Sequence, residues 1–146
     1  MTQRLNVADL TPEAYQGFLA VEGFLHGCGL PQATLELVKL RASQINGCSF
    51  CVHMHSRDLR KAGESEERLW SVAAWREATV YTPAERAALA LTEEATRLAD
   101  REAVPDTVWR EAAEHYDERQ LASLVVAIAM INAWNRIAVT TRLTPA

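Results

Sequence analysis

The spacing of apolar residues is the feature that most constrains the fold of this chain. Apolar side chains recur at intervals of three and four residues, and the strict alternation typical of a half-buried strand is almost absent. Ala, Leu, Glu and Arg, which favour helices, dominate the sequence. No internal repeat, low-complexity tract or linker-like segment interrupts the pattern. The sequence therefore predicts an all-α protein, a single-domain bundle of about six to seven helices over residues 1–146.

Capping residues and turn signals set the expected helix ends. Thr11 followed by Pro12 opens the first helix, Asn46-Gly47 supplies a turn, the segment 82–85 resembles a capping box, and Asp117 caps the last helix. The expected helices run over about 11–25, 31–44, 48–61, 65–77, 82–101, a short helix from 105, and 117–140.

The charge and composition of the chain argue against two classes of protein, those that bind nucleic acid and those that span a membrane. Fifteen basic against nineteen acidic side chains leave a formal charge of -4, so the chain lacks the basic surface that nucleic-acid binding needs. The longest apolar run, Leu124 to Ile131, has eight residues, whereas spanning a bilayer takes about 20. The N-terminus lacks a secretory signal, which predicts a cytoplasmic protein. Thiols are normally reduced there, so a cysteine pair is expected to be catalytic or metal-binding.

Two of the expected helices are apolar on more than one face. The helix over 31–44 should be largely enclosed, although Glu36 lies in its middle. The last helix is apolar nearly all round between Leu124 and Trp134, which favours burial against another subunit. We therefore expect a homo-oligomer. The tryptophans are expected to be core or interface anchors; they are Trp70, Trp75, Trp109 and Trp134.

The segment from Cys48 to His55 carries the candidate chemistry. Helical geometry places Cys48, Cys51 and His55 on one stripe, and the two cysteines are close enough to form a disulfide without unfolding. Their position at a helix start favours thiolate over thiol. His55, one turn beyond Cys51, can exchange a proton with a thiol.

A carboxylate is the other group that this chemistry needs. In peroxide reduction one thiolate attacks the O–O bond and a second thiol condenses with the resulting sulfenic acid. A histidine in contact with a carboxylate can protonate the leaving oxygen. Glu36 is the candidate, because an acid among Leu35, Leu37 and Val38 needs a partner. A salt bridge to Lys39 or Lys61 is the alternative for this side chain.

Other assignments remain open for the same residues. Cys48, Cys51 and His55, with Glu36 or a water, could be the ligands of a tetrahedral zinc site. A disulfide reductase or redox-linked interaction protein would use the same cysteine pair. Haem attachment requires a histidine directly after the second cysteine, where this chain has Val52.

Several further polar residues receive structural interpretations. Cys28 is expected to be a small packed residue, and surface or interface positions are expected for His26, His53 and His115. Asn132, Asn135 and Arg136 are expected to tie helix ends or a subunit contact together, with substrate binding as the alternative.

The spacing of Glu36, Cys48, Cys51 and His55, together with residues 41–47 before the cysteines, resembles the alkylhydroperoxidase D family of the carboxymuconolactone decarboxylase-like superfamily. The later run 132–136 is similar to the closing helix of single-domain members. The resemblance implies an all-α, oligomeric protein, with a hexamer or trimer favoured. It further implies a redox-active cysteine pair that reduces hydrogen peroxide or organic hydroperoxides and is reset by an external dithiol, with no cofactor and no metal.

The resemblance also implies roles for individual residues. A relay through Glu36 and His55 activates Cys51, the attacking thiol, and Cys48 is the resolving thiol. The best-known members carry a histidine directly before the second cysteine, where this chain has Phe50. Members that decarboxylate muconolactones typically lack the cysteine pair, so its presence argues against that activity.

Overall fold

The computed structural model describes residues 2–145, and these residues contain only helices, turns and irregular segments. The all-α expectation is therefore confirmed. The elements in chain order are α1 (Val7–Leu10), α2 (Pro12–His26), α3 (Gln32–Ile45), α4 (Ser49–Lys61), α5 (Glu66–Ser71), the 3-10 helix η1 (Val72–Ala74), α6 (Pro83–Thr96), the 3-10 helix η2 (Leu98–Asp100), α7 (Asp106–His115) and α8 (Glu118–Thr141).

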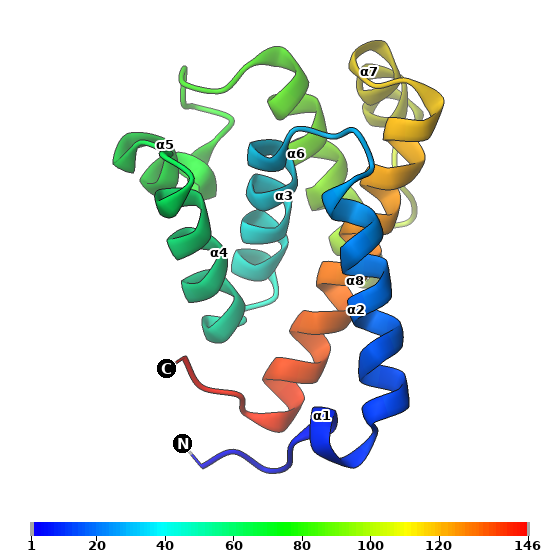
Figure 1. Ribbon diagram of the computed structural model, residues 1–146. Coiled ribbons are helices and arrows are strands. Elements are labelled where there is room, and N and C mark those ends of the chain that lie inside the picture. Colours follow the sequence, from blue (N-terminus) through cyan, green and yellow to red (C-terminus); the bar gives the residue numbers. More distant parts are fainter. Residues whose placement is uncertain (1, 146) are drawn as a thin grey trace.

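Helix α3 is the centre of the bundle. It packs against α4, α6 and α8, which surround it in Figure 1. Leu35 and Val38 join one hydrophobic cluster, Leu37 and Leu40 join a second, and Ala42 joins a third. A helix that supplies three clusters must be apolar on several faces, so the expected enclosure of this segment is confirmed.

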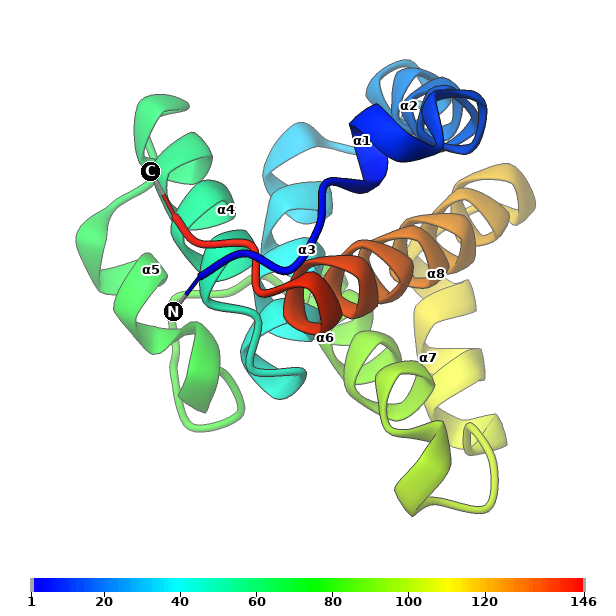
Figure 2. The same ribbon diagram turned by 90° about the horizontal axis from the view of Figure 1, so that it is seen from below.

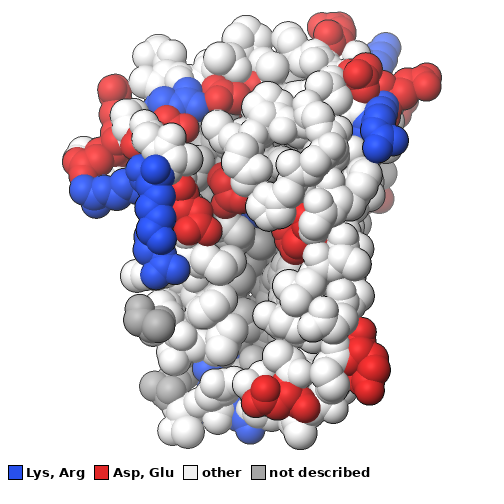
Figure 3. Space-filling view, in the orientation of Figure 1, with Lys and Arg blue, Asp and Glu red and all other residues white. Residues whose placement is uncertain are grey.

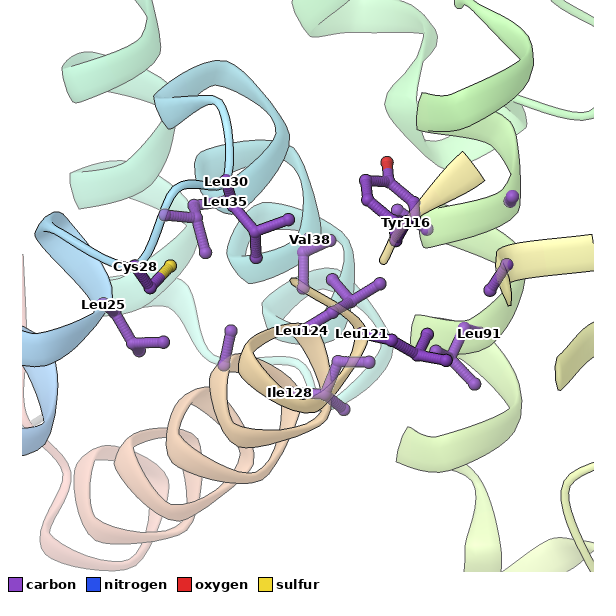
Figure 4. Close-up of a cluster of buried hydrophobic side chains, with 14 residues drawn as sticks. Leu25, Cys28, Leu30, Leu35, Val38, Leu91, Tyr116, Leu121, Leu124 and Ile128 are labelled. Atoms are coloured by element: carbon purple, nitrogen blue, oxygen red, sulfur yellow. The ribbon is translucent and has the colours of Figure 1, made fainter. Parts of the chain in front are cut away.

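The largest cluster joins the first half of α8 to α2, α3 and α6. Figure 4 shows Leu124 and Ile128 of α8 beside Val38 and near Leu91 of α6. Cys28 belongs to this cluster and is 4% exposed, so its predicted packing role is confirmed.

The apolar residues of α8 form part of the hydrophobic core of this fold. Among residues 2–145, α8 alone is long and apolar enough to span a bilayer by length and composition, with a mean hydropathy of 1.5 over its most apolar window. A core helix of a bundle meets the same test, and α8 supplies much of the largest cluster. Val125, Val126 and Val139 are nevertheless exposed. Burial of this face by another subunit remains a prediction.

Two helix ends have the predicted side-chain caps, and a third has the predicted N-cap residue without a capping hydrogen bond. Thr82 and Glu85 form a reciprocal capping box at α6, and Asp117 forms another with Gln120 at α8. Thr11 is the N-cap residue of α2 and Pro12 follows it, as predicted, but the Thr11 side chain makes no capping hydrogen bond: its hydroxyl donates to the carbonyl of Val7, at 2.8 Å. That carbonyl belongs to α1, a one-turn helix that the sequence interpretation missed, and the α-helices of the described chain therefore number eight rather than six or seven.

Two expected helices end earlier than predicted. The helix expected over 65–77 stops at Ser71 and continues as η1. After η1, Arg86 of α6 donates to the carbonyls of Trp75, Arg76 and Ala78, so these carbonyls are bonded from another helix. The helix expected over 82–101 ends at Thr96, and η2 follows it.

The tryptophans divide between core and surface. Trp75 is buried and Trp134 is half-buried, whereas Trp70 is 75% exposed and Trp109 is 44% exposed. Trp70 and Trp109 are therefore not core residues of this chain, and an interface position for them stays a prediction.

Candidate functional site

The turn between α3 and α4 fixes the start of the cysteine helix. Gly47 has φ of 64°, a left-handed conformation that glycine adopts without strain. Asn46 Nδ2 donates to Oδ1 of Asn132 and of Asn135, both at 2.9 Å, and Asn135 Nδ2 donates to Ser43 Oγ at 3.0 Å. The two asparagines of α8 thus tie this turn in place, as their structural interpretation predicted.

Arg136 differs from those asparagines. It is exposed and donates to the carbonyl of Asn132, at 3.0 Å, within its own helix. In the described chain it therefore makes no tie to the turn comparable to those of Asn132 and Asn135.

The two cysteines lie at the first turn of α4 as buried free thiols. Cys48 is the N-cap residue, and its Sγ accepts a hydrogen bond from the backbone N–H of Cys51 at 3.3 Å. The hydrogen bond from the Cys51 thiol is the main reason that the pKa of Cys48 falls from 9.0 to about 6, although burial opposes this. The same hydrogen bond, with burial, raises the pKa of Cys51. A single proton on the pair therefore favours the Cys51 sulfur.

Glu36 and His55 form a buried pair between α3 and α4. His55 Nδ1 lies 2.7 Å from Glu36 Oε2, and the two residues are 5% and 7% exposed. Burial acts to raise the pKa of Glu36, but the hydrogen bond with His55 and the charges of His55 and Lys39 together lower it below 4.5. An ionised carboxylate only accepts, so in the neutral form of the imidazole Nδ1 carries the proton and Nε2 carries the lone pair.

His55 Nε2 is the unsatisfied atom of this arrangement. It is buried and has no hydrogen-bond partner within residues 2–145. A buried polar atom normally finds a partner, and an exception points to a reacting or binding group. His55 can therefore accept a proton through Nε2 while Glu36 stabilises the resulting imidazolium.

A cavity of about 510 Å³ opens beside these groups, between α2, α4, α8 and the two terminal segments. Cys51 and His55 line it, whereas Cys48 lies outside its lining. Most of the wall is apolar; it includes Tyr15, Leu19, Phe50, Met54, Trp134 and Ile137. The volume falls within the range of small-molecule sites.

The terminal segments close one side of this cavity. Gln3 and Leu5 line it, and the backbone N–H of Arg4 donates to the carbonyl of Thr141 at the end of α8, at 2.8 Å. Figure 2 shows the first and last segments running side by side across this end of the bundle. In Figure 3 the surface is hollowed between the α4 side and the α2 side, with acidic side chains above the hollow and mostly uncharged surface directly around its lower part.

The cysteines do not join the group of side chains best placed for a metal ion. Within residues 2–145, ligand atoms of Glu36, His55 and Asp58 lie within 4.8 Å of one another. Lys39 Nζ lies 3.8 Å from Glu36 Oε1, and its positive charge works against a cation there. The geometry thus favours neither the alternative zinc site at Cys48, Cys51 and His55 nor a metal site at Glu36, His55 and Asp58.

Residues 12–94 match the model of the carboxymuconolactone decarboxylase family. The chain belongs to this family. It is 41% identical over 139 residues to the uncharacterized protein YdfG of Bacillus subtilis, covering 95% of this chain and 94% of that protein. The resemblance to alkylhydroperoxidase D-like proteins is confirmed by the family match together with two solved structures.

Both solved structures share this fold. One is a protein of unknown function from Agrobacterium tumefaciens, named as a candidate antioxidant defence protein AhpD, with a TM-score of 0.94, 39% identity and 99% of both chains covered. The other, an uncharacterized peroxidase-related protein from Ralstonia eutropha with an alkylhydroperoxidase AhpD core, has a TM-score of 0.82 and 22% identity. That match covers 96% of this chain and 74% of the other chain.

The sequence interpretation of this family member did not place Asn135 or Ser43 beside the cysteines, or Lys39 beside Glu22. Asn135 and Ser43 hydrogen-bond to the Cys51 thiol and lower its pKa, against the larger effects that raise it. Lys39, considered only as a partner of Glu36, makes its closest contact with Glu22 at 2.7 Å. Their relevance depends on helices that are distant in sequence, so spacing alone gave no signal for them.

The remaining histidines behave largely as expected. His26, His53 and His115 are exposed, and His26 also lines the cavity.

Proposed function

We propose that this family member is a thiol-dependent peroxidase that reduces hydrogen peroxide or organic hydroperoxides. The observation that carries the proposal is the pair of free thiols at the start of α4, beside a His55–Glu36 pair whose Nε2 is unpartnered at a largely apolar cavity. The antioxidant and peroxidase-related descriptions of its structural relatives support the same class. The cysteine pair argues against lactone decarboxylation.

The first step is carried by Cys51, because Cys51 lines the cavity. His55 Nε2 takes the proton of the Cys51 thiol, and the thiolate attacks the peroxide. An S–O bond forms as the O–O bond breaks, and the alkoxide takes the proton from His55 and leaves as an alcohol. Cys51 is then a sulfenic acid, oxidised by two electrons while the peroxide is reduced by two.

The second step is carried by Cys48, whose pKa of about 6 in the resting pair makes it a thiolate before the reaction begins. It attacks the sulfenic sulfur, so that an S–S bond forms, the S–O bond breaks, and hydroxide takes up a proton and leaves as water. An external dithiol must return two electrons and two protons to the disulfide. Such a cycle suits the cytoplasm, where dithiol reductants keep thiols reduced, and we place the protein there as a homo-oligomer.

Turnover of cumene hydroperoxide with dithiothreitol tests the proposal. The wild-type protein should consume the peroxide, Cys48→Ser and Cys51→Ser should lose turnover, and Cys28→Ser should retain it, because Cys28 lies in the core cluster of α2, α3 and α8. Wild-type activity no greater than that of the double Cys48→Ser/Cys51→Ser variant contradicts the proposal.

Trapping of the sulfenic acid with dimedone tests the roles of the thiols. We expect the adduct in Cys48→Ser, which retains Cys51. An adduct found only in Cys51→Ser would reverse the two roles while leaving the peroxidase function in place.

A protein disulfide reductase is the second candidate, favoured by the lowered pKa of Cys48. A dedicated disulfide exchanger would reduce insulin disulfides quickly and show negligible peroxide turnover. Elemental analysis tests the metal alternative, since one zinc retained per chain would favour a metalloprotein.

A further inference from the structure

Lys39 is a buried charge that the proposed chemistry leaves unused. Its side chain is 5% exposed, and its ammonium lies 2.7 Å from Glu22 Oε2 and 3.8 Å from Glu36 Oε1. Lysines are seldom buried without a partner, because removing the ammonium from water is expensive. Lys39 therefore bridges a carboxylate on α2 and a carboxylate on its own helix.

Glu22 is held from its other side as well. Trp134 Nε1 donates to Glu22 Oε1 at 3.0 Å, while Lys39 donates to Oε2. Both oxygens of Glu22 are thus engaged, which anchors the ammonium at the wall of the cavity. The contacts continue from Trp134 through Glu22, Lys39 and Glu36 to His55, and so connect four helices.

The groups that face Glu36 show what Lys39 contributes. Gln32 donates to Oε1 at 3.1 Å from the same helix, and His26 of α2 acts on Glu36 through its charge. From α4 come His55 and Asp58. Lys39 alone among these groups carries a permanent positive charge, whereas Asp58 and Glu22 add negative charge nearby.

We propose that Lys39 is a positioning residue that keeps Glu36 ionised and thereby keeps the lone pair of His55 on Nε2. This inference rests on the proposed peroxidase function for its catalytic meaning. Lys39 acts through Glu36 and does not contact the reacting sulfur. Without Lys39, Glu36 faces Glu22 and Asp58 while buried, and both burial and like charges favour its protonated form. A protonated Glu36 no longer stabilises the His55 imidazolium.

NMR titration of the Glu36 carboxyl tests the electrostatic part directly and needs no enzymatic activity. Lys39→Met should raise the pKa of Glu36 by about one unit or more, the usual effect of losing a cation at this distance. Lys39→Arg, which keeps the charge, should restore most of the wild-type value. Lys61→Met, which removes an exposed charge from the far end of α4, should leave it unchanged.

Glu22→Gln changes the charge near Glu36 in the opposite direction to Lys39→Met. It removes a negative charge near Glu36 and frees the ammonium toward Glu36, so the pKa of Glu36 should fall or stay constant. General loosening of the site would not raise the pKa of Glu36 in Lys39→Met while leaving it constant or lower in Glu22→Gln. This variant also tests the inference should Lys39→Met fail to fold, because a raised Glu36 pKa in Glu22→Gln contradicts it.

The pH profile of peroxide turnover is the functional readout. In Lys39→Met the acid limb should move to higher pH by about one unit or more, with turnover most reduced at low pH. In Glu22→Gln the acid limb should not move upward. A folded Lys39→Met protein with an unchanged Glu36 pKa overturns the inference, whatever the activity. If the wild-type protein shows no peroxidase activity, the proposed function fails, and the carboxyl titration alone decides the role of Lys39.

Discussion

Replacement of Glu36 by glutamine is the most informative perturbation of the site. Glutamine keeps the shape of the side chain and can still accept a hydrogen bond from His55 Nδ1, which lies 2.7 Å from Oε2 in the native pair. The charge is lost. A hydrogen bond to a charged group contributes about 1.5–3 kcal/mol and a neutral one about 0.5–1.5 kcal/mol, so the imidazolium loses about 1–2 kcal/mol of stabilisation.

The lost stabilisation of the imidazolium lowers the rate of peroxide turnover. Each 1.36 kcal/mol corresponds to about a factor of ten, so Glu36→Gln should lower the peroxide turnover rate by about 5- to 30-fold. The assay is cumene hydroperoxide consumption with saturating dithiothreitol, with thermal unfolding measured in parallel to confirm the fold. The expected loss is in the chemical step, so single-turnover formation of the Cys48–Cys51 disulfide should slow by the same factor.

A matched control separates the site from general loss of a buried acid. Glu94 is also buried, and its carboxylate receives a hydrogen bond from Arg101 at 2.8 Å, away from the cavity. Glu94→Gln should alter stability but leave turnover within about twofold. If Glu36→Gln is folded and also stays within about twofold of wild type, the His55–Glu36 pair does not stabilise charge in the reaction, and the relay is refuted.

The other predictions concern ionisation and backbone strain. Thiolate absorbance at 240 nm should titrate with a midpoint near the Cys48 pKa of about 6, and Cys48→Ser should abolish that transition. Trp75, Arg41 and Arg76 hold the pKa of Glu93 below 4.5 against the effect of burial, so its contribution to stability is complete above pH 4.5 and is lost as pH falls through the lower folded value. Glu93→Gln should therefore cost about 2 kcal/mol by urea denaturation at neutral pH, with the deficit shrinking below pH 4.5; a constant deficit contradicts this assignment. Gly47→Ala should destabilise the protein by about 1 kcal/mol because of its positive φ alone, since nothing lies within 4 Å of an added Cβ, whereas Gly17→Ala inside α2 should be neutral or stabilising.

The helices could be predicted because their signals are local. Periodicity and the boxes at Thr82 and Asp117 depend on residues within one turn of each other, and the structure has both caps. The segment after α5 is held instead by Arg86, which reaches back from α6 to three carbonyls. No pattern within the segment 65–77 indicates that contact. The error therefore lies in a segment that is held by tertiary hydrogen bonds.

The candidate site likewise has features that local spacing predicts and features that depend on how the helices pack. The common stripe of Cys48, Cys51 and His55 follows from spacing on one helix. The contact of Glu36 with His55 is predicted because a buried acid needs a partner and because the spacing resembles that of the family. The bridge from Lys39 to Glu22 joins α3 to α2, and its position depends on how these helices pack. The terminal segments that wall the cavity are brought together by a contact between Arg4 and Thr141, residues at opposite ends of the chain.

The unequal thiols show why local spacing could not assign their roles. Helix position and pKa both favour a thiolate on Cys48, which would make it the attacking residue if ionisation alone decided. Access favours Cys51, because Cys51 lines the cavity and Cys48 does not. The two properties are compatible if a base removes the Cys51 proton only during the reaction, and His55 Nε2 is the buried, unpartnered atom suited to that step. A low-pKa thiolate held behind the attacking sulfur is then poised to resolve the sulfenic acid as soon as it forms, which limits further oxidation of Cys51.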